Sequence, residues 1–125
     1  MGVIPRSETT IHEFAGVRFT GLIAPSKGST ELMAWQTEVP PGTEPAIHQV
    51  TREEIVVILS GLATVHYDGT AIEAKAGDAI VVPADTDFAL ENAGDETLRV
   101  LACMPVEGRA RMHGATETLQ LPWMV

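Results

Sequence analysis

Residues 40–61, PPGTEPAIHQVTREEIVVILSG, carry the clearest structural signal in this chain. The stretch begins with a proline–proline–glycine turn signal and ends at Ser-Gly. Its second half, residues 54–59, is the most β-prone run of the sequence, because β-branched side chains fit the pleated surface of a sheet. His48 and Glu54 are the two side chains here that acid–base or metal chemistry can use.

Short strands separated by turn signals continue on both sides of this stretch. The ranges expected to form strands are 14–23, 31–39, 46–50, 54–59, 63–67, 70–73, 79–82, 88–91 and 97–104. Asp68-Gly69 is a strong signal for a tight hairpin between two of them. No long segment has the 3.6-residue period of a helix, so the sequence predicts an all-β antiparallel barrel or sandwich.

A chain of 125 residues is expected to form one domain, residues 1–125, with a single core. The barrel core is expected over about 14–105. A C-terminal tail follows over about 106–125, with a helical turn before Leu121. Residues 1–10 are expected to form a loose arm. Trp123, near the end of the tail, is expected to pack it onto the barrel or onto a partner subunit.

Composition and charge narrow the classes of partner. Hydrophobic residues make up 45% and charged residues 20%, as in ordinary soluble proteins. No apolar run approaches the ~20 residues that span a bilayer, the N-terminus lacks a signal-peptide pattern, and Cys103 has no second cysteine to pair with. A cytoplasmic location is therefore expected. The net charge of -9 argues against nucleic acid or an anionic membrane as a partner.

The stretch described first resembles the first motif of the cupin superfamily. That motif reads Gly, five residues, His, one residue, His, three or four residues, Glu, six residues, Gly. Gly42, His48, Glu54 and Gly61 fall at matching positions. Val50 stands where the motif has its second histidine.

A second cupin motif follows at the short distance typical of small bacterial cupins. Gly77, Pro83 and Asn92 match its Gly, Pro and Asn. Asp85 and Phe88 stand where it has its second Gly and its His. The resemblance implies a small double-stranded β-helix, the jelly-roll barrel of the cupins, and a homodimer.

In metal-binding cupins the three motif histidines and the glutamate are the ligands. This chain keeps only His48 and Glu54 of the four, whereas catalytic sites use about three protein ligands. No metal or other cofactor is therefore expected. The alternative is a divalent transition metal on an atypical ligand set, with dioxygenase-like chemistry. His12, His66 or His113 would then have to point inward, and His66 is expected to be exposed.

Without a metal, the resemblance places His48 and Glu54 inside the barrel within hydrogen-bond reach of each other. Such a pair is suited to acid–base catalysis of isomerisation, cyclisation or decarboxylation. The alternative is a barrel that binds a ligand without catalysis, or that binds nothing. Both functional hypotheses have a small molecule as partner, so whether the protein is an enzyme stays open.

An apolar pocket is expected around this pair, because small-molecule sites are mostly apolar with a few convergent polar groups. Its expected lining residues are Val50, Val56, Ile58, Phe88, Met33, Trp35, Tyr67 and Cys103. Arg109 and Arg111 have two interpretations: they guide a carboxylate to the barrel mouth, or they are ordinary surface residues.

Overall fold

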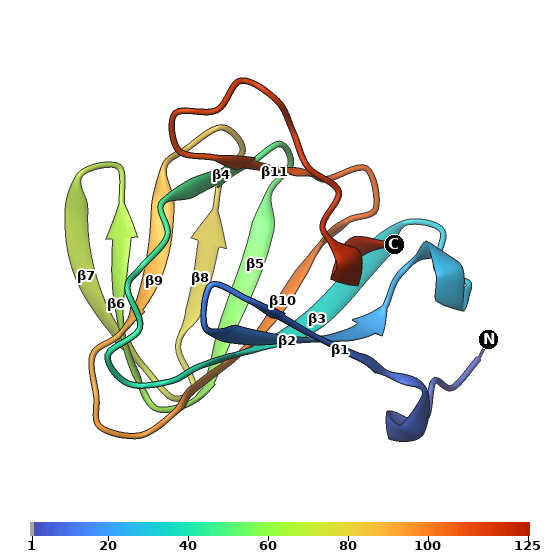
Figure 1. The fold of residues 1–125 in the computed structure, drawn as a ribbon, viewed down its shortest axis with the longest axis horizontal. Helices are drawn as coiled ribbons and strands as arrows, with labels where there is room; N and C mark the ends of the chain where they lie inside the picture. Colours follow the sequence, from blue (N-terminus) through green and yellow to red (C-terminus); the bar gives the residue numbers. More distant parts are fainter. Residues whose placement is uncertain (1) are drawn as a thin grey trace.

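In the computed structural model, which describes residues 2–125, two antiparallel sheets form a barrel (Figure 1). One sheet has the strand order β1-β2-β3-β10-β5-β8 and the other β11-β4-β9-β6-β7. The strands are β1 Thr10–Phe14, β2 Val17–Ile23, β3 Leu32–Val39, β4 His48–Val50, β5 Glu54–Ser60, β6 Leu62–Tyr67, β7 Thr70–Lys75, β8 Ala79–Val82, β9 Phe88–Asn92, β10 Leu98–Pro105 and β11 Ala110–Met112. Three short 3₁₀ helices are η1 Arg6–Glu8, η2 Pro25–Lys27 and η3 Pro122–Met124.

The all-β prediction is confirmed, and most strands lie where the sequence placed them. The hairpin at Asp68-Gly69 joins β6 to β7, with positive φ at both residues. The strand expected over residues 14–23 is confirmed only from Val17, where β2 begins. Ala15 and Gly16 also have positive φ, so the chain reverses there and β1 pairs with β2. Within the loose arm expected over residues 1–10, Arg6–Glu8 form η1 and Thr10 begins β1, and Met1 lies outside the described residues.

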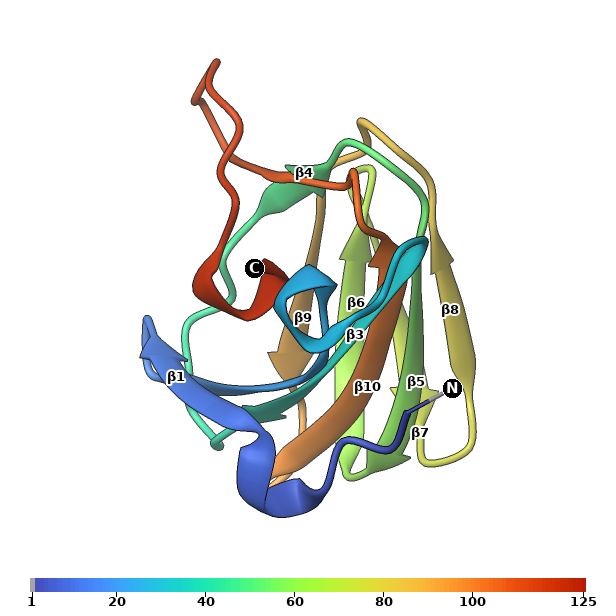
Figure 2. The same cartoon turned by 90° about the vertical axis from the view of Figure 1, so that its right-hand side faces the viewer.

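The C-terminal tail is part of the barrel wall. Strand β11 pairs with β4, and the chain then runs down to η3 (Figure 2). The helical turn lies at η3 rather than before Leu121, since proline is well tolerated in the first turn of a helix. The Trp123 ring stacks on Phe19 of β2 at a centroid distance of 3.7 Å, so its expected packing onto the barrel is confirmed.

The core follows the two-residue alternation of the long strands of the larger sheet. In β3, β5 and β10 every second side chain points inward and is buried. These residues are Met33, Trp35, Thr37 and Val39, then Glu54, Val56 and Ile58, then Leu98, Val100, Ala102 and Met104. Glu54 is the ionisable residue among these inward-facing side chains. Burial of a carboxyl group in an apolar interior is unfavourable, so its presence here indicates a specific role.

Two of the matched motif residues have structural roles. Gly61 has φ 93°, and a Cβ there would lie 3.0 Å from Leu98 Cα, so the close approach of β10 requires glycine. The buried Asn92 side-chain amide donates to the carbonyl oxygens of Val39, at 2.8 Å, and Glu96, at 2.7 Å. Asn92 thus ties β9 of one sheet to β3 of the other. Within residues 2–125 no helix is long and apolar enough to cross a membrane.

Candidate functional site

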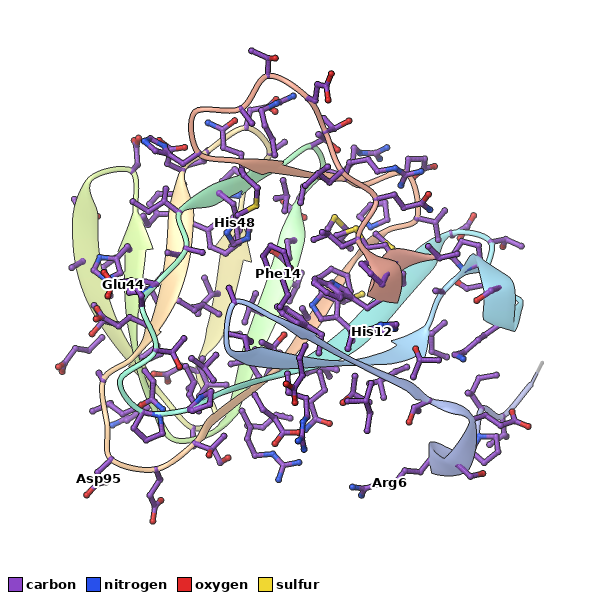
Figure 3. All side chains as sticks on the ribbon, viewed as in Figure 1. Arg6, His12, Phe14, Glu44, His48 and Asp95 are labelled. Carbon is purple, nitrogen blue, oxygen red and sulfur yellow. The ribbon has the colours of Figure 1, made fainter. Side chains whose placement is uncertain are left out.

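A cavity of about 130 Å³ lies between the two sheets. Its aromatic lining residues are Phe14, Phe19, Trp35, Phe88 and Trp123. Its polar lining residues are Thr37, Thr43, Glu44, His48 and Glu54. The remaining lining residues are aliphatic side chains, Ala and Pro. In Figure 3 the labelled side chains of His48 and Phe14 both point into the space enclosed by the sheets. The site is a concave apolar surface with a few polar groups, as small-molecule sites usually are.

Four residues expected in the pocket line this cavity: Trp35, Val50, Val56 and Phe88. Val50 and His48 project from β4 on the same side, because two-residue spacing along a strand keeps side chains on one face. Phe88 pairs with His48 across β9 and β4.

The other four expected pocket residues do not line the cavity, so their assignment needs correction. Met33 and Ile58 point inward but lie further along β3 and β5, where they are fully packed in the core. Tyr67 ends β6 and packs against the core while half-buried. Cys103 lies between the inward positions of β10 and therefore has the outward parity of its strand.

His48 is held in one orientation by its surroundings. Its Nδ1 lies 2.9 Å from the carbonyl oxygen of Ala46, and its ring lies 4.3 Å from the Phe88 ring. Because a carbonyl oxygen only accepts hydrogen bonds, Nδ1 carries the hydrogen and Nε2 keeps a lone pair in the neutral ring. Burial lowers the pKa of His48 below its ordinary value, and the hydrogen bond to Ala46 opposes that shift. The imidazole is therefore neutral at pH 7.

Glu54 begins β5 and is 5% exposed. Its Oε1 is buried and has no hydrogen-bond partner. Burial raises the pKa of Glu54 to about 8, because an apolar interior penalises the charged carboxylate. The side chain is thus a protonated acid at pH 7, able to donate a hydrogen bond into the cavity.

The expected hydrogen bond between His48 and Glu54 is absent: no hydrogen bond or ion pair joins the two side chains. The two residues belong to different sheets: His48 lies on β4 of the five-stranded sheet, and Glu54 lies on β5 of the six-stranded sheet. The His48 ring instead contacts the Ala46 carbonyl and the Phe88 ring, which is tilted by 49° to it. The two groups share one cavity but remain separate.

The remaining basic residues singled out in the sequence lie outside the cavity. His66 is half-exposed and bonds to Glu91 Oε1 at 2.8 Å. His113 is exposed, with Nδ1 3.9 Å from Asp87. Arg109 donates to the carbonyl oxygens of residues 106 and 108. Arg111 donates to Gln49 and Asp85, because β11 turns Ala110 and Met112 inward and Arg111 outward.

The donor set does not fit the metal centre that the cupin resemblance implies. His48 is oriented as a metal ligand often is, with Nδ1 on a carbonyl and Nε2 free. Glu54 would be the second ligand, but Val50 and Phe88 present hydrocarbon at the other two motif positions. Within residues 2–125, no group of three or more His, Cys, Asp or Glu side chains is placed to hold an ion. The chemistry discussed below therefore uses the chain's own groups.

Sequence reasoning missed the part of the lining that comes from the two ends of the chain. These residues are Phe14, Ala15, Val17 and Phe19 from the N-terminal hairpin, and Ala110, Met112, Leu121, Trp123 and Met124 from the tail. The inward–outward alternation of Ala110, Arg111 and Met112 was the one local signal for β11. The apolar Leu-Pro-Trp-Met run of the tail signalled packing, but not its place over the cavity.

Comparison with known proteins agrees with this architecture. The polyketide cyclase RemF from Streptomyces resistomycificus superposes with a TM-score of 0.78 at 21% identity, over 98% of this chain and 95% of that one. An RmlC-like cupin from Shewanella frigidimarina gives 0.70 at 20% identity, over 84% and 90%. A predicted oxalate decarboxylase from Thermotoga maritima gives 0.69 at 24% identity, over 83% and 98%.

Sequence comparison identifies the family. An uncharacterized protein of Methanocaldococcus jannaschii is 36% identical over 78 residues, which are 62% of this chain and 62% of that protein, less than two thirds of its length. The sequence model described as the cupin domain matches residues 35–104, more than half of the chain. This match includes most of β3, all of β4 to β9 and almost all of β10, and therefore the strands that carry both motifs. The chain belongs to the cupin domain family.

Proposed function

We propose that the barrel binds a small, mostly apolar molecule in its cavity and that Glu54 is the polar group that recognises it. The observation that carries the proposal is the Glu54 carboxyl, which is buried without a partner in an otherwise apolar lining. The fold itself does not choose a ligand, because its solved relatives include a cyclase and a predicted decarboxylase.

An unpaired buried carboxyl reduces stability, which makes it an indicator of function. A buried polar group without a hydrogen bond costs roughly 1–3 kcal/mol, and most such groups in folded proteins do find partners. A ligand with an oxygen or nitrogen acceptor near Glu54 would supply the missing partner. The aromatic side chains that line the cavity would supply the apolar contact.

Fragment binding followed by ligand-observed NMR tests this proposal. Wild-type protein is expected to bind single-ring neutral fragments such as 4-methylphenol and benzamide. Glu54→Gln keeps a hydrogen-bond donor and is expected to bind within a few-fold of wild type, whereas Glu54→Leu is expected to bind at least tenfold more weakly. Glu53→Leu changes the exposed neighbour of Glu54 and serves as the matched control.

Ala46→Trp places a bulky side chain at an exposed position of the cavity lining and is expected to block binding. Unchanged affinity in both Glu54→Leu and Ala46→Trp would show that the fragments bind elsewhere and would refute the proposal.

A second function, proton transfer, is favoured by the separation of His48 from Glu54. At pH 7 the cavity holds a neutral base, His48 Nε2, and a neutral acid, Glu54. No hydrogen bond joins the two groups, so each is available to a substrate. Burial raises the pKa of Glu54 toward neutrality, which suits a general acid, and burial keeps the His48 ring deprotonated at pH 7, so that it can accept a proton.

In such a reaction His48 Nε2 removes a proton from the carbon next to a substrate carbonyl. As the C–H electrons form the carbon–carbon double bond, the carbonyl oxygen takes the Glu54 proton and an enol results. Where a second carbon–carbon double bond of the substrate is conjugated with the enol, the protonated His48 returns its proton to the far carbon of this dienol. The double bonds shift, the enol O–H returns its proton to the Glu54 carboxylate, and an isomer of the substrate results. No external oxidant or reductant is needed.

Deuterium exchange into the α-positions of cyclohexanone in D₂O tests this second function without knowledge of the natural substrate. Wild type is expected to accelerate exchange over buffer, and His48→Gln and Glu54→Leu are expected to fall to the buffer rate. His113→Gln and Glu53→Leu, both at exposed sites, are the controls. Bound ketone without accelerated exchange would refute catalysis and leave the binding function standing.

A further inference from the structure

The residues that line the cavity favour uncharged ligands over anionic ones. Its titratable lining residues are Glu44, His48 and Glu54, and no Lys or Arg lines it within residues 2–125. His48 is neutral at pH 7, so the lining offers no positive charge. Arg109 and Arg111, the nearest basic residues in sequence to the lining of β11, bond to groups outside the cavity.

A carboxylate or phosphate ligand would therefore enter this cavity without a counter-ion. Moving a charged group out of water without a partner costs far more than moving a neutral one. The formal net charge of -9 adds long-range repulsion of anions. The lining thus disfavours anionic ligands at the mouth, where Glu44 is exposed, and in the interior, where Glu54 lies.

The volume of the cavity is suited to one ring. An engineered apolar cavity of about 150 Å³ takes up benzene, and the volume here is about 130 Å³. The rings of Trp35, Phe88 and Trp123 offer flat surfaces for contact with a planar ligand. The buried Thr37 hydroxyl provides one more polar group among them.

We infer that the natural ligand is an uncharged, planar, single-ring molecule with a carbonyl or hydroxyl oxygen that meets Glu54, and that carboxylates of the same shape are rejected. This inference rests on the proposed binding function and adds the charge and size of the ligand. Thr37 and His48 would contact the polar edge of the ring, and the aromatic side chains would contact its faces.

Benzamide and benzoate test the inference, because they have nearly the same shape and differ in charge. Affinities are measured at pH 6.5 by ligand-observed NMR and by quenching of tryptophan fluorescence, since Trp35 and Trp123 both line the cavity. Benzamide is expected to bind at least tenfold more tightly than benzoate. Both signals are expected to vanish in Ala46→Trp. 2-Naphthamide, with two rings, is expected to bind more weakly than benzamide.

The outcomes separate this inference from the proposed function. If benzoate binds as tightly as benzamide, and Ala46→Trp abolishes the binding of both, the charge preference is overturned and the proposed binding function stands. Tighter binding of 2-naphthamide would overturn the size assignment in the same way. Failure of all three compounds to bind would overturn the inference and the proposed function together.

Discussion

His48 and Glu54 line the same cavity from opposite sheets without a hydrogen bond between them. His48 Nδ1 is engaged by Ala46, while Glu54 Oε1 has no partner. A directly bonded pair would satisfy both groups and leave little for a ligand. The observed separation leaves an acceptor, His48 Nε2, and a donor, the Glu54 carboxyl, available to a molecule that enters the cavity.

Glu54→Gln is expected to make the protein less sensitive to alkaline pH. The pKa of Glu54 is about 8 in the folded protein and 4.5 in an ordinary environment, so between these values the unfolded chain releases a proton that the folded chain retains. Stability from this group is full at low pH and falls as pH rises through that window. Relative to the Gln variant, wild type should lose roughly 4 kcal/mol of unfolding free energy between pH 5 and pH 9.

Urea denaturation at both pH values measures this difference, with Glu53→Gln as the control at the exposed neighbouring position. Parallel pH dependence of wild type and Glu54→Gln would mean that the Glu54 carboxyl finds a partner in solution.

The tautomer of His48 is a second prediction. The Ala46 carbonyl should keep the hydrogen on Nδ1, and burial should keep the pKa of the ring below its ordinary value. Long-range ¹H–¹⁵N spectra at pH 7 are expected to show Nδ1 protonated and Nε2 unprotonated. A spectrum with the hydrogen on Nε2 would remove the proposed base, because no lone pair would then face a substrate from that atom.

The double variant Val50→His, Phe88→His is expected to gain a metal site. Val50 shares the inward face of β4 with His48, and Phe88 pairs with His48 from β9. Together with His48 and Glu54, the two introduced histidines would give four donor side chains, which suits a divalent ion. Equilibrium dialysis should show about one zinc or manganese ion per chain, and Glu54→Leu in the same background should weaken binding. Unchanged affinity for both metals would mean that these positions do not converge.

Trp123 is expected to support both the fold and the cavity. Its ring is buried and stacks on Phe19 in nearly parallel planes, 1° apart. Trp123→Ala should cost roughly 3–5 kcal/mol of unfolding free energy and weaken fragment binding. Trp123→Phe should retain most of both, and Leu119→Ala, at an exposed tail position, is the control. An unaffected cavity in a folded Trp123→Ala protein would contradict the role of the tail as a cavity wall.

Local sequence patterns were sufficient for the all-β class, and the resemblance to the cupin motifs was needed for the barrel. Turn signals such as Asp68-Gly69 and the two-residue alternation of β3 and β5 are properties of neighbouring residues, so they can be read without the tertiary structure. Gly61 and Asn92 were identified by their match to the cupin motifs, and the structure shows why glycine and asparagine stand there.

The details of the site were less predictable, because they depend on contacts between distant segments. Inward parity identified Val56 as a pocket residue, but it could not show that Ile58, two positions further along, lies beyond the cavity. The resemblance to the cupin motifs placed His48 and Glu54 in one barrel, but it could not show the Ala46 hydrogen bond that orients the imidazole. The cover formed by Trp123 depends on how the tail returns over the barrel.

The pKa of the Glu54 carboxyl tests the central claim most directly. Its side-chain ¹³C carboxyl shift, assigned by comparison with Glu54→Gln, would be followed by NMR from pH 4 to pH 10 without added ligand. A midpoint near 8 is predicted, because the group is buried and unpaired in an apolar cavity. A midpoint near the ordinary value of 4.5 would show a solvated or paired carboxylate, and would contradict both the recognition role and the acid role assigned to Glu54.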